Sequence, residues 1–201
     1  MTTRKKLTSP ERILKAAIKL FVKKGYNATS VAEIMKAAGL TRGALYCHFE
    51  TKEHLAHEII KLFEEKFLKN MMAFVEESGG NSMTRIENMI RFDIRFAGEN
   101  PDLCLFMTLI SAEMCGSGNR LESHLRTFYK KWCDFVADIL EEGKRAGELS
   151  NTINSSFLAL IILGTHDGVF LHLKMNRGIT DLRTYTRHFR NLIVSGVKGQ
   201  K

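Results

Sequence analysis

Side chains that can hydrogen-bond to phosphates and to base edges are concentrated in segment 29–55 of this 201-residue chain. Within it, Leu45 and Phe49 are four residues apart, so a helix over 42–49 would bury both on one side. The other side would carry a guanidinium, a phenol and an imidazole, which have the chemistry to contact nucleic acid. The residues left facing outward are Arg42, Gly43, Tyr46 and His48.

The sequence around these residues predicts a helix-turn-helix unit. Ser30, followed three residues later by Glu33, forms a capping box that predicts a helix start. That helix would end at Gly39, because glycine readily adopts the left-handed conformation found at helix C-termini. Thr41 is the next expected N-cap, and Thr51 opens a further helix. Two helices joined by a glycine-containing turn form the unit whose second helix enters the DNA major groove.

The run TSVAEIMKAAGLTRGALYCHFETKEHL, residues 29–55, resembles the DNA-binding motif of the tetracycline-repressor (TetR) family. The resemblance covers about residues 10–60, and the remainder is similar to the family only in length and helical character. It implies a transcriptional regulator that binds double-stranded DNA at a palindromic operator. The residues at family positions are Gly39, Thr41, Gly43, Leu45, Tyr46, His48, Phe49, Lys52 and Glu53.

The resemblance also implies roles for individual side chains. Arg42 is the implied base contact, because its planar guanidinium matches guanine O6 and N7. Gly43 would let the helix approach the groove closely, and Ala44 would touch a thymine methyl group. For Tyr46 and His48 an ordinary position on the helix surface is the alternative. The implied phosphate contacts, which fix register without reading sequence, are Thr29, Ser30, Thr41, Tyr46, His48 and Lys52.

The net charge of +8 lies wholly in the first quarter of the chain. Residues 1–52 hold eleven Lys or Arg against three acids, whereas the remaining 149 residues hold nineteen of each. A basic face on one domain is typical of a polyanion-binding protein, and its affinity should depend strongly on salt. A solvated lysine-rich helix is the alternative for Lys19, Lys23 and Lys24 alone.

The sequence predicts a soluble, cytoplasmic and nucleoid-associated protein. The N-terminus is charged and polar, with no apolar run behind it that would indicate a signal peptide. No segment has about 18 uninterrupted apolar residues, the length of a membrane span. The four cysteines have no C-x-x-C spacing, and we expect reduced thiols packed in helices.

The pattern predicts an all-α fold of about nine helices, with a three-helix DNA-binding domain followed by a helical ligand-binding and dimerisation domain. Residues 1–52 would form a basic arm and the helix-turn-helix domain, with Ser9 capping the first helix and Gly25 ending it. A helix over 52–77 would connect to the second domain, 78–201. The later helices are predicted at Met83–Ala97, Asp102–Met114, Arg120–Ala146, Asn154–Met175 and Asp181–Val197.

The last two predicted helices each carry an apolar stripe. Paired with their copies across a two-fold axis, they would form a four-helix dimer interface; closure of a monomer core is the alternative. DNA binding by this motif favours the dimer, because a symmetric operator needs two recognition helices. The stripes are Leu158, Ile161, Ile162, Thr165, Val169 and Leu173, and Phe189, Leu192, Ile193 and Val197.

The second domain is expected to bind a small lipophilic effector that releases the protein from DNA, as the family resemblance implies. Such release requires the effector to prefer the conformation that does not bind DNA. Aromatic and methionine side chains at helical spacing more often pack in the hydrophobic core than contact a ligand, so we expect most of the apolar candidates to be core residues. The ligand-binding candidates are Phe92, Asp93, Phe96, Met107, Ile110, Glu113, Met114, Trp132, Phe135, His166, Asp167 and Phe170.

The sequence predicts no enzyme, no cofactor and no metal site. It has no phosphate-binding glycine loop, no G-x-S-x-G and no H-E-x-x-H. His54 and His57 are three residues apart, but without a third ligand they make a poor metal site. The alternative function is a constitutive accessory or architectural DNA-binding protein whose second domain only dimerises. An internal cavity would favour the effector-responsive regulator over that alternative.

Overall fold

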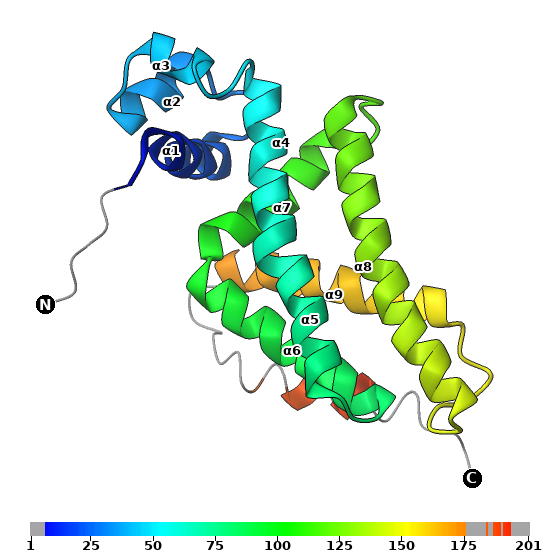
Figure 1. Cartoon of the computed structure of the whole chain (residues 1–201). Helices are drawn as coiled ribbons and strands as arrows, with labels where there is room; N and C mark the ends of the chain where they lie inside the picture. Colours follow the sequence, from blue (N-terminus) through cyan, green and yellow to red (C-terminus); the bar gives the residue numbers. More distant parts are fainter. Residues whose placement is uncertain (1–6, 176–183, 185–186, 190, 194–201) are drawn as a thin grey trace, which may run out of the picture. The chain divides into compact units, whose positions relative to one another are not determined.

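The computed structural model describes residues 7–175, 184, 187–189 and 191–193. The elements of this described part are helices and turns, with no strand, so the fold is all-α as predicted (Figure 1). The chain divides into two compact units, each made of two separate stretches. The first contains residues 1–63 and 102–125, and the second contains residues 64–101 and 126–201.

The first unit contains the helix-turn-helix. Its buried core is apolar, as the helical spacing predicted, and includes Ile13, Phe21, Ile34, Leu55 and Ile59. In Figure 1 the three short N-terminal helices lie together beside the start of α4. The helices of this unit are α1 (Ser9–Lys24), α2 (Val31–Ala38), α3 (Arg42–Tyr46), α4 (Lys52–Phe63), α7 (Pro101–Met114) and the first residues of α8 (Arg120–Arg145).

The predicted helix ends of α2 and α4 are confirmed, and that of α1 is corrected. The Ser30 hydroxyl accepts a hydrogen bond from the backbone N–H of Glu33, and Gly39 is left-handed with φ 63°. The Thr51 hydroxyl accepts from the backbone N–H of His54, which caps α4. The N-cap of α1 is Thr8 rather than Ser9, because Glu11 is three residues after Thr8 and completes a capping box with it.

The predicted helix over 52–77 is present, but it is not uniformly α-helical. After α4 the chain adopts a π-helix, η1 (Glu64–Lys69), and then continues as α5 (Asn70–Ser78). The division between the two units falls where α4 gives way to η1. π-Helical segments are rare, and those that occur are frequently at functional sites, so this segment is a candidate location for a functional site.

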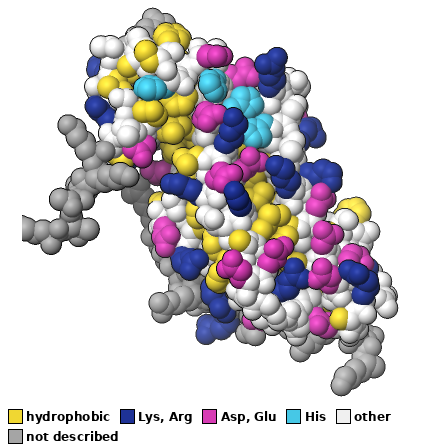
Figure 2. Space-filling view, viewed as in Figure 1, with side chains coloured by type: hydrophobic (Ala, Val, Ile, Leu, Met, Phe, Trp, Pro, Cys, Tyr) yellow, Lys and Arg dark blue, Asp and Glu magenta, His cyan; other side chains and the backbone are white. Residues whose placement is uncertain are grey.

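The second unit is built from η1, α5, α6 (Ser82–Glu99), the remainder of α8 and α9 (Ser155–Met175). Asn81 caps α6 by accepting from the backbone N–H of Thr84. The face in Figure 2 shows acidic and basic side chains interspersed over these helices, in keeping with the zero net charge beyond residue 52. The predicted later helices are therefore confirmed to within two residues at each end, except Asp181–Val197, which lies largely outside the described residues.

The structure bears on two expectations from the sequence, and it corrects the packing of the cysteines. Residues Ser155–His172 of α9 have a mean hydropathy of 1.3 and are long and apolar enough to span a membrane by length and composition, although Thr165, His166 and Asp167 interrupt them. The four cysteines are free, but Cys47 and Cys115 are exposed in turns rather than packed in helices.

Candidate DNA-binding surface and ligand site

The predicted recognition helix is shorter than its sequence pattern suggested. We predicted a helix over Arg42–Phe49, but α3 ends at Tyr46, and the next residues form a turn that brings Phe49 into the core. The ring of Phe49 packs edge-on against His54 at 6.0 Å between centroids, which accounts for the early end of the helix.

The outward-facing positions of this segment are open to a ligand. Tyr46 is 54% exposed and His48 is exposed. A Cβ built at Gly43 would meet no atom within 4 Å, so this side of α3 is unobstructed. Ala44 is half-buried, and Thr41 is exposed. The side chain of Arg42 lies outside what the structure describes.

Two of the predicted phosphate contacts use their hydroxyl groups within the protein. Thr29 is only 1% exposed, and its hydroxyl donates to the carbonyl of Gly25 at 2.7 Å. Ser30 caps α2, and its hydroxyl also donates to the carboxylate of Glu33. An ion pair with Lys24 and the Ser30 hydrogen bonds lower the pKa of Glu33 to about 2. The contacts of Thr29 and Ser30 with DNA stay predictions.

The loop between α1 and α2 is held from two sides. The Lys52 ammonium donates to the carbonyls of Tyr26 at 2.8 Å and of Thr29 at 3.0 Å, and reaches that of Asn27 at 3.4 Å. The Glu113 carboxylate accepts from the backbone N–H groups of Tyr26 and Asn27 at 2.8 and 3.0 Å. Lys52, Glu113 and the loop 26–29 are called the loop clamp below. Because it fixes the chain just before α2, the clamp positions the helix-turn-helix.

The electrostatics of the loop clamp reflect its partial burial. Burial lowers the pKa of Lys52, and the nearby Glu113 carboxylate opposes that shift. Burial raises the pKa of Tyr26, and Glu53 and Glu113 raise it further. Lys52 was predicted to contact phosphate, and that role stays a prediction. Its carbonyl partners give it a structural role that the motif alone did not indicate.

Arg12 is a second residue whose role the sequence pattern missed. Its guanidinium donates to the carbonyls of Ala38 and Gly39, at 2.6 and 3.2 Å. These carbonyls belong to the C-terminus of α2, where helix carbonyls lack partners within the helix and the dipole favours a cation. Arg12 therefore holds the turn that leads into α3. Its only signal in the sequence was its positive charge.

The second unit contains an aromatic cluster around Phe67 of the π-helix. The Phe67 ring lies 4.9 Å from that of Trp132, 5.2 Å from Phe96 and 6.1 Å from Phe92. His166 packs edge-on against Trp132 at 5.2 Å. Most residues of this cluster were predicted to line the ligand site or to belong to the hydrophobic core. Their rings are in contact with one another, which is the arrangement expected in a packed core.

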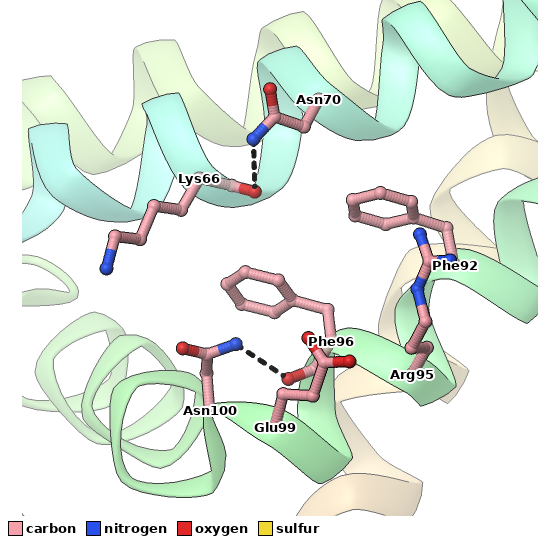
Figure 3. Close-up of a pocket in the computed structure, with 7 residues that line it drawn as sticks. All are labelled: Lys66, Asn70, Phe92, Arg95, Phe96, Glu99 and Asn100. Atoms are coloured by element: carbon pink, nitrogen blue, oxygen red, sulfur yellow. Dashed lines mark hydrogen bonds between the residues drawn. The ribbon is translucent and has the colours of Figure 1, made fainter. Parts of the chain in front are cut away.

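An open pocket of about 530 Å³ lies at one edge of this cluster, between η1 and α6 (Figure 3). Phe92 and Phe96 present their rings to it from α6, facing Lys66 on the opposite helix. The Arg95 guanidinium lies 5.2 Å from the Phe92 ring centroid, a cation–π contact that orders this side chain. The full lining is Lys66, Asn70, Phe92, Arg95, Phe96, Glu99 and Asn100.

The predicted ligand-binding residues are divided between the two units. Four of them, Met107, Ile110, Glu113 and Met114, belong to the first unit, and Glu113 is part of the loop clamp. Sequence spacing could not show this, because α7 belongs to the same compact unit as the N-terminal helices, which are far from it in the sequence. Phe92, Asp93, Phe96, Trp132, Phe135, His166, Asp167 and Phe170 belong to the second unit.

The exposed apolar face of α9 differs from the predicted stripe. Ile162 is buried in the core, whereas Phe157 is 67% exposed and Met175 71% exposed. Leu160 and Ile161 are exposed with them, and a Cβ at Gly164 or Gly168 would meet nothing within 4 Å. The stripe was misplaced because α9 is apolar nearly all round, so its sequence does not mark which side faces solvent. Of the second stripe, Phe189 and Ile193 are buried, Leu192 is 70% exposed, and Val197 lies outside the described residues.

A histidine pair in the first unit joins His57, one of the two histidines considered as metal ligands, to His124 rather than to His54. The Nδ1 atoms of His57 and His124 are 2.9 Å apart, and the rings stack. Figure 2 shows histidine side chains gathered on this part of the surface. Burial, together with His124, lowers the pKa of His57. Among the described residues no three His, Cys, Asp or Glu side chains form a metal-ligand set.

Comparison with known protein families agrees with this architecture. Residues 13–59 match the model for bacterial regulatory proteins of the tetR family. Residues 82–189, more than half of the chain, match the model for the tetracyclin repressor-like C-terminal domain. The chain belongs to the TetR family. The helix-turn-helix of this TetR-family regulator is therefore a DNA-binding unit, and residues 82–189 correspond to the family's C-terminal domain.

Individual relatives extend over nearly the whole chain. The fatty acid metabolism regulator protein of Bacillus subtilis is 25% identical over 189 residues, 92% of this chain and 94% of that protein. The crystal structure of the MbdR regulator from Azoarcus sp. CIB has a TM-score of 0.84 and 26% identity, covering 94% of this TetR-family chain and 98% of its own. FadR from Bacillus subtilis in complex with stearoyl-CoA has a TM-score of 0.75 and 25% identity, covering 92% and 97%. All three are named as regulators, and FadR is named as a transcriptional regulator.

Proposed function

We propose that this protein is a homodimeric repressor that binds a palindromic operator and is released by a small lipophilic effector. The observation that carries the proposal is the open face of α3 with Gly43 and exposed Tyr46, followed by exposed His48 in the next turn, on a helix-turn-helix fixed by the loop clamp. The net charge of +8 in residues 1–52 supplies the long-range attraction to DNA. On this proposal the protein works in the cytoplasm on the nucleoid and has no catalytic role.

The exposed apolar face of α9 supports the dimer. Leu160 and Ile161 follow Phe157 by three and four residues, and Met175 follows it by 18 residues, which is five helical turns, so they share one side of the helix. Monomeric proteins rarely expose a contiguous apolar stripe of this kind, and the open Gly164 and Gly168 would allow a second helix to approach closely. Covering this stripe with its copy also accounts for the apolar character of α9 without a membrane.

The relative bound to stearoyl-CoA supports an effector with a long apolar portion. In this chain the effector would enter the second unit at the pocket in Figure 3, whose lining combines phenylalanine rings with Lys66 and Arg95. The rival function is a constitutive accessory DNA-binding protein whose second unit only dimerises.

One experiment separates the two functions. Genomic fragments retained by the purified protein are sequenced, and their release by stearoyl-CoA and by free fatty alcohols is measured at fixed salt. Enrichment of an inverted repeat together with release by one of these molecules supports the repressor. Enrichment without release by any of them favours the rival, and no enrichment contradicts both.

A further inference from the structure

Two polar atoms in the second unit are buried without a hydrogen-bond partner among the described residues. Asp93 is 4% exposed, and its Oδ1 atom has no partner. Trp132 is 2% exposed, and its Nε1–H has none. Leaving such a group unsatisfied costs about 1–3 kcal/mol, and more for a charged one. Apolar side chains such as leucine and phenylalanine at these two positions would avoid this cost.

Both residues line the same small cavity. Its volume is about 20 Å³, room for a single water-sized group, which requires about 10–15 Å³. His166 lines it as well and lies next to Asp167, which accepts a hydrogen bond from the Tyr129 hydroxyl. The rest of the lining is apolar: Ile90, Ile94, Ile162 and Phe189. A few convergent polar groups in an apolar wall are the usual composition of a site that orients a ligand.

Resting on the effector-responsive function proposed above, we propose that this cavity binds the hydroxyl group of a lipophilic alcohol. The hydroxyl oxygen accepts from the Nε1–H of Trp132 while the hydroxyl hydrogen is donated to Oδ1 of Asp93. The apolar remainder of the ligand then lies against the aromatic cluster around Phe67.

The chemistry of the cavity selects a hydroxyl over other groups of similar size. A hydrocarbon would leave both buried atoms unpaired. An ammonium has no lone pair to accept from Trp132, and a carboxylate would meet the like charge of Asp93 whenever Asp93 is ionised. A hydroxyl both donates and accepts, so it also fits when Asp93 is protonated. Burial raises the pKa of Asp93 to about 7, which makes both states accessible near neutral pH.

Phe67 lies between this cavity and the open pocket in Figure 3. Its ring contacts Phe92 and Phe96, which line the open pocket, and also Trp132 and His166, which line the cavity. Displacement of this one ring would connect the two spaces. The ligand therefore enters at the pocket and reaches the polar atoms by moving Phe67, a residue of the π-helix.

Trp132 is the only tryptophan of the chain, so its fluorescence reports directly on the cavity. The wild-type protein, without DNA, is titrated with three alcohols and their hydrocarbon counterparts: 1-octanol and octane, cyclohexylmethanol and methylcyclohexane, 4-ethylphenol and ethylbenzene. Octanoate tests the carboxylate class. We expect at least one alcohol to bind about 100-fold more tightly than its hydrocarbon, because sites built to hydrogen-bond a hydroxyl discriminate strongly against analogues that lack it.

Two variants complete the test. Asp93→Leu should abolish the preference for the alcohol and leave hydrocarbon affinity within about threefold. Asp93→Asn, which keeps the shape and polarity of the side chain, should retain part of the preference. The inference is overturned if no alcohol is preferred, if octanoate binds more tightly than 1-octanol, or if the preference survives in Asp93→Leu. Because no DNA is present, these outcomes are independent of operator binding, and an alcohol that binds without releasing DNA would contradict the effector function alone.

Discussion

Replacing Lys52 by methionine separates two roles that this residue can have in DNA binding. In the structure its ammonium donates to the carbonyls of Tyr26 and Thr29 and reaches that of Asn27, so its loss leaves these groups of the loop without their partner. Hydrogen bonds to charged groups contribute about 1.5–3 kcal/mol each, and partial exposure of the site reduces their sum. We therefore expect Lys52→Met to lower the free energy of unfolding by about 2–3 kcal/mol.

The assay combines urea unfolding with operator affinity measured over a range of salt concentrations. A phosphate contact contributes about one unit to the slope of log K against log salt, whereas a clamp contributes nothing to it. Lys52→Met should weaken operator binding with an unchanged slope. The control is Lys36→Met on exposed α2, which removes the same charge without losing a carbonyl contact and should change stability by less than about 0.5 kcal/mol. Full stability with a slope reduced by about one unit would refute the clamp and establish the phosphate contact.

The other predictions concern DNA contact and the pH dependence of stability. Tyr46→Phe should weaken operator binding about tenfold without changing stability, as gel-shift titration and thermal unfolding would show, since the ring is 54% exposed and loses only its hydroxyl. Because the pKa of Asp93 is raised from 3.8 to about 7, the folded state holds its proton more tightly, and the contribution of Asp93 to stability should fall as pH rises from about 4 to 7. The loss is on the order of 4 kcal/mol at most, and urea titrations of Asp93→Leu should no longer show it. A raised pKa of His166 acts in the same direction. Equal pH dependence of the wild type and Asp93→Leu would contradict the raised pKa of Asp93. The lowered pKa of His57 favours its neutral form beside His124, so the contribution of His57 to stability should fall as pH drops below about 6.5. In His57→Leu the unfolding free energy should therefore lose this part of its decrease between pH 7 and 5, and a profile equal to that of the wild type would count against it.

Local sequence signals were sufficient for the positions of most helices and for the presence of the helix-turn-helix. The capping box of Ser30 with Glu33 and the left-handed Gly39 are decided by residues within a few positions of one another, and both are confirmed. The recognition helix was predicted too long, because its end is set by the packing of Phe49 against His54 and not by helical periodicity.

The candidate sites depended on contacts that periodicity cannot show. Glu113 was assigned to the ligand site from its place in an apolar helix, yet it binds backbone N–H groups 86 and 87 residues earlier in the chain. The missing hydrogen-bond partners of Asp93 and Trp132 depend likewise on which helices surround them. Asp93, Trp132 and His166 were all among the sequence candidates, but the sequence could not distinguish them from ordinary core residues.

The most direct test of the central claim is selection of bound duplexes from a random-sequence library by the purified full-length protein. If two copies of the helix-turn-helix read DNA together, the retained duplexes will carry an inverted repeat with half-site centres about one helical turn, roughly 10 base pairs, or a multiple of it apart, and each duplex will hold an even number of chains. Retained duplexes with no sequence in common, bound by single chains, would contradict the claim.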